Sequence, residues 1–351
     1  MKILEENIHL NKLKLQLETV EDLYFASLLV DIGDLVTAWT TRQIKLERID
    51  GTERGERVRV KVTVKVKKVE FQRFSDSLRI LGLIVEAPEW LEAKGSHHTL
   101  GLKPGDEIEI TKNHLMKHHE RVLRIASAKA RAVGLISVDV DEIAVGLIRP
   151  QGLEVLSCIS LPRPNKEGSL KSQVKTALEK ALPSTIEMLK SRGVESLILL
   201  SPQLLQDIAL ECLKNFKVSV KRVEVPEGGL AGFYELLRRD ELKTVFEEAA
   251  LTTPKNALTE FLEHFFKNSD KIAIGLEEVS FALAAKAVKK LLILDEALLS
   301  DDRMQILSLL EKASETAEDV IVIPPDLEGA EILKKTNGIA ALLYFGIKNL
   351  K

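Results

Sequence analysis

RVRVKVTVKV, from Arg57 to Val66, alternates strictly between valines and polar side chains. Successive side chains of a strand point to opposite faces, so this stretch predicts a strand with one buried valine face and one basic face in water. The alternation slips at Lys67 and Lys68, before Val69. That slip predicts a β-bulge or a strongly bent strand, which small barrels use to close.

The rest of the first 130 residues fits the same small β domain. A second alternating stretch, KLKLQLE, covers residues 12–18. Thr19 followed by Asp22 has the spacing of a capping box and predicts the start of a helix. A charged helical pattern over residues 113–130 is expected to serve as a connector. Residues 1–130 therefore predict a bent, mostly antiparallel β domain with a helix near its start.

Residues 131–250 change to longer apolar runs. Three of them, AVGLISVDV, EIAVGLIR and LEVLSCISL, follow one another with short turns and predict a β-meander. A long helical pattern starts at Ser169 and is expected to be interrupted at Pro183, because proline lacks the N–H that a helix interior needs. The runs LILLS and VSVKRVEV bracket a helix expected from Pro202 to Asn215. The pattern predicts an α/β domain with a mixed sheet.

A second boundary is expected at residue 251. Thr252 and Thr253 precede Pro254, which is the order of an N-cap and a first helical position. Beyond them the runs IAIG, KKLLILD, EDVIVIPP and IAALLYFG alternate with helical patterns. Residues 251–351 therefore predict a compact α/β/α sandwich.

The formal charge of −3 conceals a local excess of positive charge. Lys and Arg total 50 against 53 Asp and Glu, but residues 42–79 hold twelve against six, and residues 251–351 hold twelve against sixteen. The excess surrounds a glycine-containing turn and contains almost no aromatics, so we expect phosphate contacts on folded RNA rather than base stacking on single strands. The expected RNA-binding residues are Arg42, Lys45, Arg48, Arg54, Arg57, Arg59 and Lys61. A solvated edge strand protected by charge is the alternative.

Other residue types limit the chemistry. No GxSxG, HExxH or CxxC motif occurs, so acyl transfer, zinc hydrolysis and redox catalysis have no sequence support. Cys158 and Cys212 lie among apolar residues and are expected to be small core residues in a reducing compartment. We find no signal-peptide pattern and no apolar run near the ~18 residues of a membrane span, so a cytoplasmic protein is expected.

Some side chains offer metal ligands. His118 lies four residues after His114 and next to His119, but no carboxylate or Cys partner stands at zinc spacing, so a solvated helix face is expected. His97 and His98, in KGSHHTLGL, are expected to cap a turn, and a contact with phosphate is the alternative. Four carboxylates would bind a divalent ion only if the fold gathered them: Glu5, Glu6, Glu21 and Asp22.

RVEVPEGGLAGFYELLRR, residues 222–239, joins a strand to a helix through glycines. Phosphate-binding loops share this order, but neither GxxxxGK[ST] nor GxGxxG occurs in this stretch. Gly228, Gly229 and Gly232 are therefore expected to form a turn. Its position before the helix that leads towards the third domain makes it a candidate hinge.

Taken together, the chain resembles the Pelota family, relatives of the archaeal and eukaryotic class-1 translation release factors. The resemblance rests on MKILEEN, GDLVTAWTTR, VEFQRFSDSLRILGLIVEAPE, GSHHTLGLKPGDEIEITK, GGLAGFYELLRR and GLEEVSFALAAKAVKKLLILDEAL, in this order. It implies a multidomain α/β protein: an Sm-like small β-barrel domain, a release-factor-like mixed α/β domain, and an α/β/α sandwich of the kink-turn-protein type.

The resemblance also implies a function, that of an mRNA surveillance and ribosome-rescue factor. Such a protein mimics a tRNA or release factor in the A site of a stalled ribosome. A GTPase of the elongation-factor 1-alpha type, in its GTP form, delivers it, and an ABC-type ATPase then splits the ribosome. Residues 1–130 would bind the A site and RNA, and residues 251–351 the GTPase. The protein would act as a monomer without membrane contact.

Residues 131–250 depart from the release factors, whose Gly-Gly-Gln loop hydrolyses peptidyl-tRNA. Here Leu230 follows the only adjacent glycines, which come after the last strand of the domain rather than before its long helix. The loop before that helix, LPRPNKEGSLK, contributes Arg163 and Lys166 to the expected RNA contacts. No catalytic residue is expected, and the nascent chain would stay bound. The alternative, an endoribonuclease that cleaves stalled mRNA, would require a divalent metal cation.

Overall fold

The computed structural model describes residues 1–7, 10–47, 53–127, 132–164, 169–194, 196–216, 219–238, 252–300 and 303–347. Packing divides the chain into two compact units. One unit holds residues 1–129, 257–325 and 329–351, and the other holds residues 130–256 and 326–328. The division into three domains at residues 130 and 250 stays a prediction.

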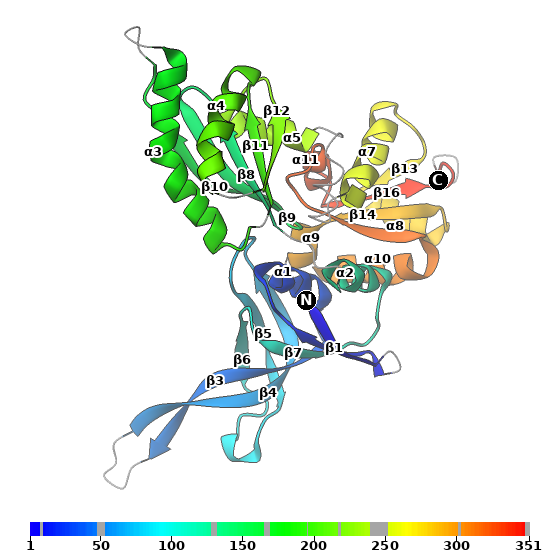
Figure 1. Ribbon diagram of the computed structural model, residues 1–351. Helices are drawn as coiled ribbons and strands as arrows, with labels where there is room; N and C mark the ends of the chain where they lie inside the picture. The colour runs from blue at the N-terminus through cyan, green and yellow to red at the C-terminus, as the bar shows by residue number, and fades with distance from the viewer. Residues whose placement is uncertain are drawn as a thin grey trace. The chain divides into compact units, whose positions relative to one another are not determined.

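A seven-stranded sheet dominates residues 1–111 (Figure 1). Its order is β1-β2-β7-β3-β4-β5-β6, and each neighbouring pair is antiparallel. The strands are β1 (Lys2–Asn7), β2 (Lys12–Gln16), β3 (Leu35–Glu47), β4 (Glu53–Phe71), β5 (Leu78–Glu86), β6 (His97–Leu102) and β7 (Glu107–Thr111). The expected antiparallel β domain is confirmed.

Strand β4 confirms the alternation and the bulge. Its valines at positions 60, 62, 64 and 66 are buried, whereas Arg59 and Lys61 are exposed. The pairing of β4 with β5 shifts register between Val66 and Lys68, where the sequence pattern slips. An extra residue on one strand increases its local twist and bend, so the bulge curves the sheet at this point.

Two helices accompany this sheet. Helix α1 (Val20–Leu29) begins with the expected capping box: the Thr19 hydroxyl accepts from the N–H of Asp22, and the Asp22 carboxylate accepts from the N–H of Thr19. Helix α2 (Lys117–Ser127) supplies the expected charged segment and packs against α1. A short 3-10 helix, η2 (Glu89–Leu91), lies between β5 and β6.

The second unit is built on a mixed sheet of order β10-β9-β8-β11-β12. Strands β8 (Val133–Val138), β9 (Glu142–Arg149) and β10 (Gly152–Ser160) form the expected antiparallel meander, and β11 (Ser196–Ser201) and β12 (Ser219–Glu224) extend it in parallel. The helices are α3 (Leu170–Ser191), α4 (Gln203–Leu213), η3 (Lys214–Phe216) and α5 (Gly229–Arg238). One apolar core joins the sheet to α3 and α4, and a separate one joins it to α5.

The interruption expected at Pro183 is wrong, because α3 continues through it to Ser191. Pro183 lies on the exposed side of the helix. The carbonyl four residues earlier, which loses its N–H partner, therefore faces solvent. On the other side Leu178, Leu182 and Ile186 are buried in the core. Tertiary packing of this apolar face holds both halves of the helix together.

The two cysteines lie in different environments. Cys212 is buried in the core of the second unit, as expected. Cys158 is exposed, so its expected place in the core is wrong. It lies on β10, an edge strand of the sheet, where a side chain can be exposed although its neighbours in the sequence are apolar.

The C-terminal residues form a four-stranded sheet of order β13-β16-β14-β15. Its strands are β13 (Ile272–Ile274), β14 (Val288–Leu294), β15 (Asp319–Ile323) and β16 (Ile339–Leu343). The helices are α7 (Thr252–Phe266), α8 (Gly275–Ala284), α9 (Asp295–Leu299), α10 (Arg303–Thr316) and α11 (Ala330–Lys334). The expected alternation of strands and helices is confirmed. Among the described residues, no helix is long and apolar enough to cross a membrane.

Helix α7 starts earlier than the proline pattern predicts. It begins at Thr252, which places Pro254 within the first turn rather than at the first helical position. The missing N–H of Pro254 costs no hydrogen bond there, because N–H groups of a first turn have no partner inside the helix.

Candidate nucleic-acid interface

Strands β3 and β4 extend as a two-stranded ribbon beyond the other strands of the first sheet (Figure 1). β3 pairs with β7 only as far as Ala38, and β4 pairs with β5 only from Thr63 onward. Within the described strands, residues 39–47 and 53–62 therefore pair only with each other. We call this segment the basic ribbon.

One face of the basic ribbon carries exposed cations. Arg57, Arg59 and Lys61 are all exposed, and they alternate with valines that point to the opposite face. These valines continue the core of the sheet, so the strand itself holds the three cations in water. Cations on an extended, solvated ribbon are placed to contact phosphate groups.

A tryptophan lies on the same face of the basic ribbon. Trp39 in β3 pairs directly with Lys61 in β4, and residues directly opposite in an antiparallel pair share a face. The Trp39 side chain is 49% exposed, and the guanidinium carbon of Arg59 lies 5.4 Å from its ring centroid. This distance is within the range of a cation–π contact.

Trp39 is not among the expected RNA-binding residues because it precedes the basic stretch. A signal was present nonetheless. Counting outward from the turn expected at Asp50 pairs residue 39 with residue 61, which is the register that the structure shows. The expectation of almost no aromatics in the basic hairpin is therefore wrong for this face.

The base of the basic ribbon is tied to its neighbours by side chains. The Thr37 hydroxyl lies 2.8 Å from that of Thr63, and Thr63 donates to the Glu86 carboxylate at 3.0 Å. Because Thr63 uses its hydrogen on Glu86, Thr37 is the donor in the first of these bonds. The three strands are thus joined beneath Trp39. Among the described side chains, this face carries mixed charge at its base and positive charge at Arg59 and Arg57.

Arg42 lies on the other face of the ribbon. It pairs with Val58 and donates from Nη2 to the Ser96 hydroxyl at 3.0 Å. Beside it the Thr40 hydroxyl lies 3.0 Å from Nε2 of His98. Burial and the positive charge of Arg42 lower the pKa of His98. His97 and His98 both belong to β6, so the turn expected for these histidines is wrong.

Five further residues are expected to contact RNA. Lys45 and Arg54 belong to β3 and β4, but only their backbone is described, and Arg48 and Lys166 lie outside the described residues. Arg163 follows β10, with its side chain 87% exposed and Nε 3.4 Å from an oxygen of Asp141. An exposed pair at this distance leaves the cation accessible to solvent.

The glycine turn is tightly packed against the end of β8. A side chain at Gly228 would overlap the carbonyl of Val138, and one at Gly232 would overlap the Ser137 hydroxyl. Gly229 has φ +57, and the N–H of Gly228 donates to Asp139 at 2.7 Å. Close backbone approach is sufficient reason for glycine at these positions. The hinge stays a prediction.

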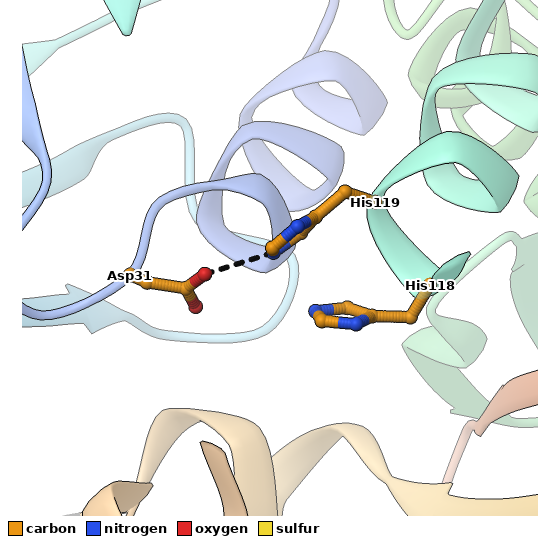
Figure 2. A group of neighbouring side chains, drawn as sticks. All are labelled: Asp31, His118 and His119. Atoms are coloured by element: carbon orange, nitrogen blue, oxygen red, sulfur yellow. Dashed lines mark ion pairs between the residues drawn. The ribbon is translucent and has the colours of Figure 1, made fainter. Parts of the chain in front are cut away.

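Asp31, His118 and His119 are the one group within the described residues whose ligand atoms lie close enough together to hold a metal ion (Figure 2). All three are buried, so the solvated face expected for the histidines is wrong. Helix α2 starts only at Lys117, so His114 precedes it and does not share its face. Burial follows from the packing of α2 against α1, which periodicity within the helix does not reveal.

The bonds of this group match a buried polar network rather than a metal centre. Nδ1 of His119 accepts from the N–H of Met116 at 3.1 Å, so a neutral ring carries its proton on Nε2, which lies 2.9 Å from Asp31. The same Asp31 oxygen lies 2.9 Å from Nζ of Lys112. A metal ion would have to displace both the proton and the ammonium group.

Lys112 is the centre of this network, which we call the Lys112 network. Its ammonium group donates to the carbonyl of Leu29 at 2.7 Å, to Asp31 at 2.9 Å and to Asp34 at 2.5 Å. Burial raises the pKa of Asp34, and the charge of Lys112 opposes that rise. The network joins the end of α1, the end of β7 and the start of α2.

The four carboxylates considered for a divalent ion do not form such a group among the described residues. Asp22 caps α1 and lies 2.5 Å from the N-terminal amine of Met1. Glu21 is buried on the same helix, whereas Glu5 and Glu6 are exposed on β1. These residues do not fit a divalent cation, so the endoribonuclease alternative is not favoured.

Family models match both ends of the chain: the Pelota N-terminal domain matches residues 1–127, and eRF1 domain 3 matches residues 251–347. A pelota homolog of Thermofilum pendens is 34% identical over 99% of this chain and 100% of its own length. The chain belongs to the Pelota family. A second relative in the Pelota family, from Sulfurisphaera tokodaii, is 31% identical over 99% of this chain and 100% of its own.

The fold agrees with that of a solved Pelota. The Pelota protein of Thermoplasma acidophilum has a TM-score of 0.73 and 21% identity, covering 99% of this chain and 100% of that one. The likeness confirms the fold class: the multidomain α/β architecture of Pelota, with an Sm-like domain followed by release-factor-like domains.

Proposed function

We propose that this Pelota-family chain is a ribosome-rescue factor that enters stalled ribosomes as a release-factor mimic and promotes subunit separation without peptide release. Full-length similarity to pelota homologs supports the proposal. The observation that carries it is the basic ribbon, whose exposed Arg57, Arg59 and Lys61 suit the phosphates of ribosomal RNA and mRNA.

The proposed partners are the stalled ribosome, a GTPase of the elongation-factor 1-alpha type in its GTP form, and an ABC-type ATPase. An archaeal Pelota whose structure is known in the ribosome-bound state with ABCE1 is 29% identical to this chain, over 99% of this chain and 100% of its own, with a TM-score of 0.39. In our proposal residues 1–130 bind the A site, residues 251–351 hold the GTPase, and the protein acts in the cytoplasm.

Co-sedimentation with ribosomes tests the proposal. Ribosomes stalled with an empty A site are expected to carry the protein through a sucrose gradient, and ribosomes whose A site holds a tRNA are not, because both ligands need the same space. Equal binding to the two preparations would show a general RNA-binding protein instead.

Substituting glutamine for Leu230 is expected to leave the protein unable to release a nascent peptide. The glycine pair packs against the end of β8 and is not part of the loop before α3, so a glutamine here is not presented as in a release factor. Release of labelled peptide from programmed ribosomes measures this. A rate above that of the unchanged chain would contradict our placement of the loop.

Truncation after Thr253 is expected to abolish complex formation with the GTPase. The remaining chain lacks the four-stranded C-terminal sheet and its helices, which in our proposal supply the GTPase contact. Pull-down with the GTPase in its GTP form measures the interaction. Full retention by the truncated chain would assign the contact to the first 253 residues.

A further inference from the structure

The outward face of the basic ribbon combines two kinds of side chain that nucleic-acid strands require together. Arg57, Arg59 and Lys61 supply positive charge, and Trp39 supplies an aromatic surface that is about half exposed. Proteins that bind single strands combine a positive groove along the backbone with aromatic side chains on which bases stack. A charged edge strand that only resists aggregation has no need of an exposed indole.

We propose that Trp39 is a stacking platform for one unpaired base of an RNA strand, with Arg59 and Lys61 holding the neighbouring phosphates. The proposal deepens the proposed function and rests on it. We favour an RNA strand over a protein partner because the cations beside the indole are placed to bind the successive phosphates of a polyanion. Every base has a π-face that can stack on an indole, so we expect the site to bind RNA without a strong sequence preference.

The position of Trp39 is set by the sheet. Its neighbour Ala38 points into the core, and the Thr37, Thr63 and Glu86 side chains join the three strands beneath it. Arg59 on the adjacent strand contacts part of the indole and orients it. A ring held in this way loses little conformational freedom when a base stacks on it.

The acidic groups nearby mark where the site ends. Glu86 accepts a hydrogen bond from Thr63 at the base of the ribbon, and Glu109 lies 3.0 Å from Lys12 on the next strands. Beyond Trp39 the described side chains on this face are the uncharged Thr41 and the cationic Arg59 and Arg57. The strand is therefore expected to run outward along the ribbon from Trp39.

Tryptophan fluorescence tests the platform directly, because the chain has only 2 tryptophans. In a full-length Trp90→Phe chain, Trp39 is the sole reporter. A short oligoadenylate is expected to quench its emission, and an abasic oligonucleotide of equal length and charge is not. Quenching by both oligonucleotides alike would overturn the proposal, since phosphates alone would then account for the signal.

Affinity measurements separate stacking from charge. Trp39→Ala is expected to weaken oligoadenylate binding about 5- to 150-fold, which corresponds to ~1–3 kcal/mol for one stacked base, and to leave the salt dependence unchanged. Lys61→Ala is expected to reduce the slope of log K against log salt by about 0.7. Trp39→Phe keeps an aromatic ring and is expected to bind nearly as the unchanged chain does.

The matched control is Trp90→Ala, which removes an indole that is 59% exposed in η2, outside the ribbon. Its affinity is expected to be unchanged, and equal affinities for Trp39→Ala and Trp90→Ala would overturn the platform. Ribosome gradients with the same variants keep the two proposals apart. If oligoadenylate binding depends on Trp39 while ribosomes with empty A sites are not bound, the platform stands and the rescue function fails.

Discussion

Replacing Lys112 by methionine is expected to destabilise the fold of residues 1–127 by about 3–5 kcal/mol. Lys112 is buried, and its ammonium group is within 3 Å of both Asp31 and Asp34. Without the ammonium group, the carboxylates of Asp31 and Asp34 stay buried without the cation that compensates their charge. Both tryptophans lie in the first 130 residues, so urea unfolding followed by their emission reports on this part of the chain.

Two further variants identify the cause. Lys65→Met removes an exposed lysine from β4 and is expected to change stability by no more than ~0.5 kcal/mol. Adding Asp31→Asn and Asp34→Asn to Lys112→Met is expected to recover part of the loss, because no buried charge then remains uncompensated. Equal unfolding midpoints for Lys112→Met and Lys65→Met would show that the Lys112 network contributes no stability.

The Lys112→Met deficit is also expected to depend on pH. Burial already raises the pKa of Asp34, and loss of the lysine raises it further. A carboxyl whose pKa is higher in the folded state stabilises the fold when protonated, and that contribution is lost as the pH rises through the folded pKa. The free energy of unfolding of the variant should therefore approach that of the unchanged chain at acid pH and be lower than it at neutral pH.

Changing Arg57, Arg59 and Lys61 together to alanine is expected to weaken binding to ribosomes with an empty A site about 10- to 100-fold at physiological salt. Binding releases fewer counterions when phosphate contacts are lost. The slope of log K against log salt should therefore fall in magnitude by about 2–3 units. Ribosome co-sedimentation at several salt concentrations measures both quantities. Thermal stability should change little, because all three side chains are exposed.

A control with the same change of charge is available at the other end of the chain. Lys267, Lys271 and Lys335 are exposed outside the first sheet, and their triple alanine variant is expected to keep the salt slope of the unchanged chain. If both triple variants bound ribosomes alike, net charge rather than the basic ribbon would govern association. The ribbon would then be a charged edge.

Local pattern was enough for much of the fold. The period-two alternation of residues 57–66 predicts which face of β4 is buried, and the slip at Lys67 predicts its bulge. The spacing of Thr19 and Asp22 predicts the start of α1. Each of these features depends on neighbours within a few residues, where backbone geometry and side-chain direction follow directly from sequence.

The failures have a common physical origin in long-range packing. His118 and His119 look like a solvated pair on a charged helix, yet α2 packs its start against the end of α1 and buries them. Pro183 looks like a break, yet buried leucines on the opposite side keep α3 whole. Packing against distant elements outweighs local preference at these places.

The sequence by itself determined the strands, the start of α1, the family and the stretch of positive charge. The tertiary structure decided how closely the side chains that share a face of the basic ribbon approach one another, and what covers the opposite face. Trp39 and Arg59 are far apart along the chain, and strand register brings them to 5.4 Å, while Arg42 from the same basic stretch is turned to the opposite face. A shift of one residue in that register would exchange the two faces, because side chains alternate along a strand.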